Sequence, residues 1–213
     1  MKKIIFSGGF VGRGFRLPDI RKNLLLWSML ASLFAGVATG AFHGRNADAE
    51  MLQSLDLLFL TDFRAGRTQT LHGAFAASFA SAFIFMLMIF LSGMSLWGVV
   101  SAAVVPFIKG YGYGLSVGFL YSAYGLSGIG YNALVILPGA MLCSVVIASA
   151  ARQAILCSAK ILTLFRKTAV SDDPRVFMRH YLLAMLWLLL LAAVSSLIDM
   201  IFTAAFSQLF NFG

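Results

Sequence analysis

Long uncharged stretches, separated by short segments that carry the charges, dominate this 213-residue chain. The first, residues 23–42, is long enough to cross a hydrocarbon core of about 30 Å as a helix. A cleaved signal peptide has an apolar core of only about 7–15 residues, so the length favours a retained first helix. Two further uncharged runs cover 73–108 and 110–151, and a last apolar run covers 181–206 with Asp199 as its one charge.

The run 73–108 is too long for one spanning helix and too short for two with a turn, because each needs about 20 residues. We place one helix at 74–92 and expect an interfacial or re-entrant segment at 94–107. Gly93 interrupts the run, and Pro106 closes it because proline has no N–H and clashes with the preceding turn. In transporters such breaks build binding sites; the plainer interpretation is a cytoplasmic elbow without a ligand.

The uncharged run 110–151 has the length of two helices and a tight turn. We place them at 110–126 and 132–151, because Gly128 and Gly130 between them permit positive φ. Pro138 would kink the second of these helices or mark a late start. The pattern therefore predicts an all-α, polytopic integral membrane protein with five transmembrane helices, at about 23–42, 74–92, 110–126, 132–151 and 181–206.

The basic residues gather between these runs. Segments 1–22 and 152–180 each hold six Lys and Arg side chains. If the N-terminus is cytoplasmic, thirteen of the sixteen Lys and Arg residues, Lys109 included, lie inside, and three lie in the outer segment 43–72. This split obeys the positive-inside rule. We therefore expect a multi-pass protein of the cell membrane with a cytoplasmic N-terminus and an extracytoplasmic C-terminus.

Composition supports lipid as the solvent of this chain. Hydrophobic residues make up 60% of it and charged residues 11%, against about 25% charged in soluble domains. A soluble protein this apolar could not cover its surface with polar groups. Membrane orientation also explains the net charge of +8 better than nucleic-acid binding does, so membrane lipid is the expected partner and nucleic acid is not.

The segments outside the runs have simpler assignments. Residues 1–22 form a basic cytoplasmic head, and 207–213 form a short tail after the membrane domain 23–206. Within 43–72, apolar residues at helical spacing predict a short amphipathic helix at 49–61, either a partner surface or a lid without a partner. Segment 152–180 should extend the fourth helix, turn, and start the last helix at its proline.

No motif for an enzyme, metal or cofactor occurs. Zinc spacing, a P-loop, a nucleophile elbow and a Rossmann fingerprint are all missing. The histidines His43, His72 and His180 lie at membrane ends and form no helical pair. An aspartate intramembrane protease needs two facing aspartates, and only Asp199 is intramembrane. We therefore expect a non-enzymatic protein without a cofactor, and with two packed thiols, Cys143 and Cys157.

Two charged groups remain as candidates for a site. Lys109 is the only charge between Arg67 and Arg152. We expect it to snorkel to the cytoplasmic interface, the alternative being a place inside the protein. Asp199 either reaches the outer interface near its helix end, which we favour, or pairs with a basic group of a partner.

Small residues at intervals of four predict close helix docking. They form faces on the third helix, with Gly110, Gly114 and Gly118, and on the first, with Gly36 and Gly40. The second helix also has a face of small residues, which includes Ser78. Packing within one molecule is the favoured use of these faces, and homo-oligomerisation or docking of a partner is the alternative.

With this layout in place, the chain resembles the stage II sporulation protein M family, small polytopic proteins with five predicted spans. The resemblance is carried by Phe90–Gly93 with Leu96–Gly98, then Phe107–Gly114, Tyr124–Gly128 and Ile136–Pro138. Many family members carry Pro-His-Gly with an acidic residue soon after. In this chain Pro138 is followed by Gly139, and neither a histidine nor an acid follows.

The resemblance implies a scaffold in the mother-cell membrane that anchors two peptidoglycan-degrading partners, stage II sporulation proteins D and P, during engulfment. Docking faces on the first, third or fifth helix would receive the partners' single membrane anchors. The competing class is a small-solute transporter or the membrane subunit of an ATP-driven exporter, supported by the interrupted run 74–108 and the basic segment 152–180. A membrane-anchored regulator is a third possibility.

Overall fold

The structure, a computed structural model, describes residues 24–45, 71–165 and 174–206, and these residues form an all-helical fold, as predicted. Its elements are α1 (Leu24–Gly44), α3 (Leu71–Met94), α4 (Gly98–Tyr131), the π-helix η1 (Asn132–Ile136), α5 (Leu137–Phe165) and α6 (Pro174–Phe206). The basic head 1–22, the amphipathic helix expected at 49–61 and the tail 207–213 lie outside the described residues.

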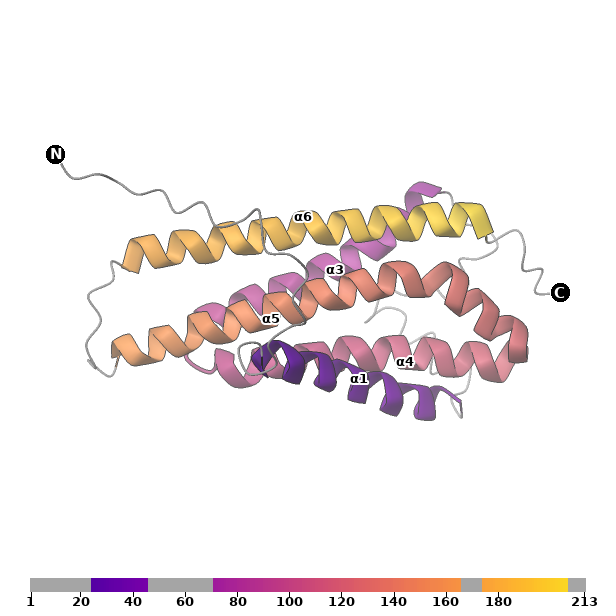
Figure 1. Ribbon diagram of the computed structural model, residues 1–213, viewed down its shortest axis with the longest axis horizontal. Helices are drawn as coiled ribbons and strands as arrows, with labels where there is room; N and C mark the ends of the chain where they lie inside the picture. Colours follow the sequence, from indigo (N-terminus) through magenta and orange to yellow (C-terminus); the bar gives the residue numbers. More distant parts are fainter. Residues whose placement is uncertain (1–23, 46–70, 166–173, 207–213) are drawn as a thin grey trace, which may run out of the picture.

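The helices lie alongside one another in an elongated bundle (Figure 1). One end, here called the Trp97 end, gathers the start of α1, the turn between α3 and α4, the end of α5 and the start of α6. The opposite end, here called the Leu126 end, gathers the end of α1, the start of α3, the bend between α4 and α5, and the end of α6.

The predicted number of five spanning helices is wrong, because the described residues contain four helices long and apolar enough to cross a membrane. The third is the continuous stretch Gly98–Leu162, in which α4, η1 and α5 follow one another. No separate turn divides it at 127–131. Instead the chain bends at Gly125, which has a φ of 58°, and α5 then packs back against α4 (Figure 1). Among the glycines that the structure describes, Gly125 has positive φ, and the predicted Gly128 and Gly130 do not.

The interruption expected at 94–107 is also wrong. Only residues 95–97 form a bend and turn, and α4 begins at Gly98 and continues through Pro106. A proline inside a helix forfeits one backbone hydrogen bond, which a membrane helix tolerates where neighbouring helices pack around it. Pro106 is fully buried in this way. As a result Lys109 lies well inside a helix and not at its start.

Pro138 and Pro174 lie in the first turns of α5 and α6. Pro138 is the second residue of α5, which directly follows the π-helix η1, so this proline lies inside a continuous helical stretch and does not mark a late start of the helix. A local π-helical adjustment accommodates the hydrogen bond that the proline cannot donate. Pro174 is the first residue of α6, as its position in the sequence predicts. α5 continues to Phe165, which confirms the predicted extension of this helix beyond 151.

α1 and α4 approach each other backbone to backbone. A Cβ atom at Gly36 would overlap the carbonyl oxygen of Phe107, and one at Gly40 would overlap that of Tyr111. Gly44, one turn further, faces Leu115 in the same way. Glycine is therefore required along this face of α1, because any side chain would force the two helices apart.

The glycines of α4 meet α1 in the reciprocal arrangement. A Cβ at Gly110, Gly114 or Gly118 would overlap a carbonyl oxygen of α1. The three oxygens belong, in the same order, to Leu33, Val37 and Ala41. The residue numbers of the contacting pairs increase along both helices, so α1 and α4 run parallel.

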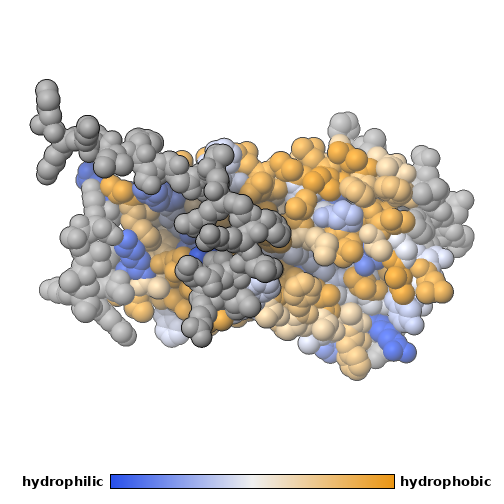
Figure 2. Space-filling model, viewed as in Figure 1, coloured by the Kyte–Doolittle hydropathy of each residue, from blue (hydrophilic) through white to orange (hydrophobic). Residues whose placement is uncertain are grey.

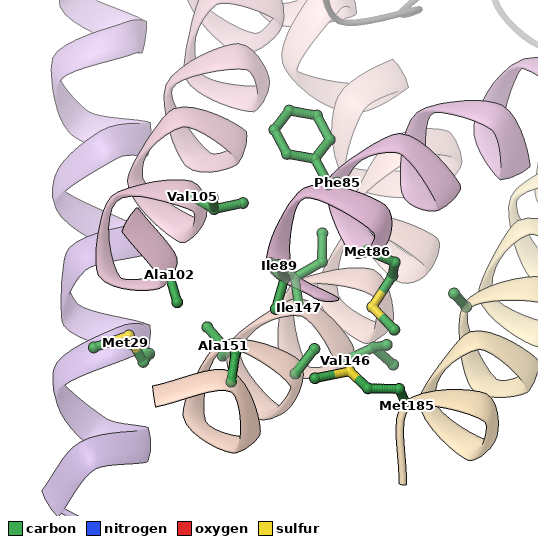
Figure 3. Packing of buried hydrophobic residues seen from close by; sticks show 14 of the residues in the cluster. Met29, Phe85, Met86, Ile89, Ala102, Val105, Val146, Ile147, Ala151 and Met185 are labelled. Atoms are coloured by element: carbon green, nitrogen blue, oxygen red, sulfur yellow. The ribbon is translucent and has the colours of Figure 1, made fainter. Parts of the chain in front are cut away.

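α5 lies at the centre of the bundle and contacts α1, α3, α4 and α6. Its buried face is rich in alanine, which lets four neighbours approach. Figure 3 shows Ile147 of α5 beside Ile89 of α3, with Ala102 and Ala151 nearby. These four side chains are fully buried. The outer faces of the helices carry large exposed apolar side chains instead, which cover much of the described surface in Figure 2.

The α1–α4 contact predicts the effect of enlarging its glycines. Gly114→Leu should lower the free energy of unfolding by about 3 kcal/mol, because a branched side chain cannot fit between two touching backbones. The measurement is SDS-induced unfolding of the purified protein in mixed micelles. Ala38→Leu on the exposed face of α1 is the matched control and should change stability little. Equal stability of the two variants would contradict the contact.

Candidate functional site: a buried polar network around Lys109 and Asp199

Lys109 lies inside the bundle, so the prediction that it snorkels to the interface is wrong. Its side chain is 4% exposed. Its Nζ donates a hydrogen bond of 2.6 Å to Ser81 Oγ on α3 and lies 4.7 Å and 5.0 Å from the ring centroids of Phe85 and Tyr113. Eleven residues separate Lys109 from the start of α4 at Gly98, about 16 Å along the helix, which the side chain cannot span.

Asp199 also has its partners within the chain. Ser78 Oγ on α3 donates a hydrogen bond of 2.6 Å to Asp199 Oδ2. The carboxylate rests against Gly139 in the first turn of α5, where a Cβ would overlap it. One turn earlier on α6, Ser195 Oγ donates to the Gly139 carbonyl oxygen at 2.8 Å. Gly139 thus lets α6 place its carboxylate directly on α5.

The two serines of α3 connect these charges. Ser78 and Ser81 are three positions apart, so they lie on one face of the helix. Through these serines the Lys109 ammonium and the Asp199 carboxylate lie along the same face of α3, although no direct ion pair joins them among the described side chains. Tyr113, whose ring centroid lies 5.0 Å from Lys109 Nζ, also interacts with Cys143 on α5. Four helices, α3, α4, α5 and α6, therefore contribute to one polar network.

Such a network is costly in a membrane protein. Ionisable groups at membrane depth are expensive to bury, and they usually mark a proton, ion or substrate site. The serine hydroxyls and the aromatic rings offset part of this cost, because they contact the charged groups that water would otherwise solvate. Within the described residues, this network is the strongest candidate for a functional site.

The remaining candidate residues have structural positions. Gly36, Gly40, Gly110, Gly114 and Gly118 are all covered in the α1–α4 contact, so in this structure they present no docking face to a partner.

Gly93 lies near the α3–α4 turn, where a Cβ would overlap the Tyr181 hydroxyl. That hydroxyl donates to the Phe90 carbonyl oxygen at 3.1 Å, and the two rings stack with centroids 5.7 Å apart. Gly93 therefore helps α6 to hold the end of α3. Pro106 and Pro138 sit within helices, as described above.

Several members of the network are missing from the predicted site. Ser81, Tyr113, Cys143 and Gly139 were not singled out as site residues, and Ser78 was predicted only as part of a small face. The available signal was a pair of hydroxyls three positions apart in the phenylalanine-rich run 74–92. Polar groups at helical spacing in an uncharged run indicate a buried partner, but they do not identify it.

The fold and this network define a polytopic, all-α integral membrane protein with an ionisable network in its core. A family model for stage II sporulation protein M matches residues 28–204, from α1 to α6. The chain therefore belongs to the stage II sporulation protein M family, which confirms the resemblance found in the sequence. Searches of curated proteins and of solved structures found no match. Membership indicates a sporulation-related membrane protein.

A double-mutant cycle tests whether the two charges act together. Lys109→Met and Asp199→Asn should each lower the free energy of unfolding by about 3 kcal/mol, because each leaves the opposite charge buried without its counterpart. The double variant should lose about 1 kcal/mol less than the sum. SDS titration of the four proteins provides the values.

The control cycle pairs Lys109→Met with Ser28→Ala, an exposed site on α1, and should be additive. Additivity in the Lys109–Asp199 cycle as well would show that the two groups are independent and would contradict the network.

Proposed function

We propose that this protein is a non-enzymatic scaffold of the cell membrane that anchors and localises peptidoglycan hydrolases during engulfment. Family membership supports a role in sporulation. By resemblance, the partners are stage II sporulation proteins D and P, which perform the wall chemistry. Among the described residues no group of three or more His, Cys, Asp and Glu side chains could hold a metal ion.

The main support for this proposal is that some helix faces are used within the molecule, whereas one broad apolar face is left exposed. The glycine faces of α1 and α4 are used within the molecule, so a partner's membrane anchor must dock elsewhere. The helix predicted as the fifth, which is α6, has a broad apolar face directed away from the bundle. On this face Leu186 is 54% exposed and Trp187 is 67% exposed. An apolar face of this kind accepts either lipid or a single transmembrane helix.

A groove between α3 and α6 narrows the choice of docking site. It is entirely apolar in character and is lined by Phe83, Met86, Leu87, Phe90, Leu182, Met185, Leu186 and Leu189. A groove between two parallel ridges can seat the ridge of a third helix, which is how helices pack. We place the partners' anchors in this α3–α6 groove.

The distribution of basic residues supports the orientation. The Trp97 end would be cytoplasmic, since it receives the chain from the basic head 1–22 and from the segment 152–180. We infer that the single bent stretch Gly98–Leu162 crosses the membrane in α4 and returns in α5, so that the four spanning helices make five crossings. In this arrangement the N-terminus is cytoplasmic and the C-terminus extracytoplasmic.

A second candidate function is a small-solute transporter or the membrane subunit of an exporter. One observation favours it. The Lys109–Asp199 network supplies intramembrane polar groups, which such a protein needs and which the uncharged runs of the sequence did not suggest.

Filling the α3–α6 groove tests the scaffold. Affinity purification of the wild type in mild detergent from sporulating cells should recover cell-wall hydrolases with single membrane anchors. Leu186→Trp should reduce that recovery at least tenfold, because the larger ring occupies the groove. Phe34→Trp on the exposed face of α1 is the matched control and should recover them normally.

The same experiment separates the two candidates. Recovery of a nucleotide-binding ATPase without hydrolases would overturn the scaffold in favour of the exporter. Normal hydrolase recovery with Leu186→Trp would reject the groove and keep the scaffold.

Cysteine labelling tests the orientation. In a variant with Cys143 and Cys157 replaced by alanine, single cysteines at the exposed positions Leu126 and Ala205 should react with an impermeant maleimide in intact cells. Cysteines at Trp97 and Val176 should react only after permeabilisation. Labelling of Leu126 and Trp97 from the same side would contradict the crossing of α4.

A further inference from the structure

We propose that Asp199 is an intramembrane proton-binding site, served from the Leu126 end of the bundle and coupled to Lys109. The ligand is a proton, which converts the carboxylate to a carboxylic acid and is released again as the free carboxylate. The site lies outside the proposed docking groove and adds a proton-linked property to the protein.

The place of Asp199 makes it accessible to a proton. Asp199 is half-buried, whereas Lys109 is almost fully buried. Seven residues separate Asp199 from the end of α6 at Phe206, which is about 10 Å along the helix. A proton from water at the Leu126 end therefore has a short distance to travel, and Lys109 lies deeper in the bundle.

The contacts of the carboxylate suit both protonation states. The Ser78 hydroxyl, which now donates to Oδ2, can instead accept from a protonated carboxyl, because a hydroxyl is both donor and acceptor. The other oxygen, Oδ1, rests against Gly139, which brings no side chain that would compete for the proton. Proton binding thus requires a reversal of one hydrogen bond and no repacking of side chains.

The groups around Asp199 favour a proton over a metal cation. Among the described residues, the titratable groups that interact with it are Lys109 and Tyr113 on α4 and Cys143 on α5; α3 contributes the hydroxyl of Ser78. A second cation beside the Lys109 ammonium would meet like-charge repulsion. A proton needs one oxygen and no coordination shell, and the single carboxylate provides it.

The charge of Lys109 should change the pH at which Asp199 binds its proton. With Asp199 ionised, the bundle interior holds one positive and one negative charge; with Asp199 protonated, the positive charge stands without its counterpart. Removing the Lys109 charge must therefore make the carboxyl easier to protonate. Removing the Ser78 hydroxyl must act in the same direction, because it deletes the hydrogen bond donated to the ionised form.

Infrared difference spectroscopy of the full-length protein in lipid nanodiscs, titrated with acid, tests this site. The wild type should show the carbonyl stretch of a protonated carboxylic acid growing in as the pH falls, and Asp199→Asn should remove one such component. Lys109→Met and Ser78→Ala should each move the midpoint of that component upward by about one pH unit. Ser28→Ala, on the exposed face of α1, should leave it in place.

The proposal is overturned if Asp199→Asn leaves the titrating spectrum unchanged, or if the component stays at the same midpoint in both Lys109→Met and Ser78→Ala. Should Asp199→Asn fail to fold, the midpoints of the other two variants decide. Both faces of a nanodisc meet the same buffer, so neither result depends on the membrane orientation or on the scaffold role.

Discussion

The close approach of α1 and α4 is the constraint on which the rest of the structure depends. Each helix offers a row of glycines, and each row receives the carbonyl oxygens of the other helix. In lipid there is little hydrophobic force to hold helices together, so van der Waals contact between backbones has to supply it. Because the glycine face of α4 contacts α1, the face of α4 that carries Lys109 and Tyr113 points into the bundle interior.

The polar network follows from that orientation. Lys109 cannot reach either membrane surface, so it needs contacts inside, and the bundle supplies a hydroxyl, two rings and the charge of Asp199. The first turn of α5 carries Pro138 and Gly139. Here a carboxylate reaches the same turn from α6, and Gly139 leaves room for it. The network thus ties α6, which carries the proposed docking face, to α3, α4 and α5.

The sequence predicted those features that depend on neighbouring residues. Uncharged runs located α1, α3 and α6, proline marked the start of α6, and the interval of four identified the two glycine faces. It failed where packing overrules local preference. Pro106 is a helix breaker in isolation, yet it lies within α4 because neighbours surround it. That error put Lys109 at a helix start and led to the wrong expectation of snorkelling.

The network itself could not be predicted from spacing. Ser78 and Asp199 are 121 positions apart, and Ser81 and Lys109 are 28 apart, so no local pattern connects either pair. The count of spanning helices failed for another reason. Positive φ at Gly125 and the π-helix η1 let α4 pass into α5 without a loop, whereas glycine content alone favoured a turn two residues later.

Solid-state NMR can detect the contact between the α1 and α4 backbones itself. The protein would carry ¹³C at valine carbonyl and glycine Cα positions, in lipid bilayers. If the backbones touch, a through-space cross-peak joins the Val37 carbonyl to Gly114 Cα, and it disappears when Val37→Ile removes the label from that site. A wild-type spectrum without the Val37–Gly114 cross-peak, in which the Val37 carbonyl still shows its peaks to Gly36 and Gly40 of α1, would show that the two helices are apart.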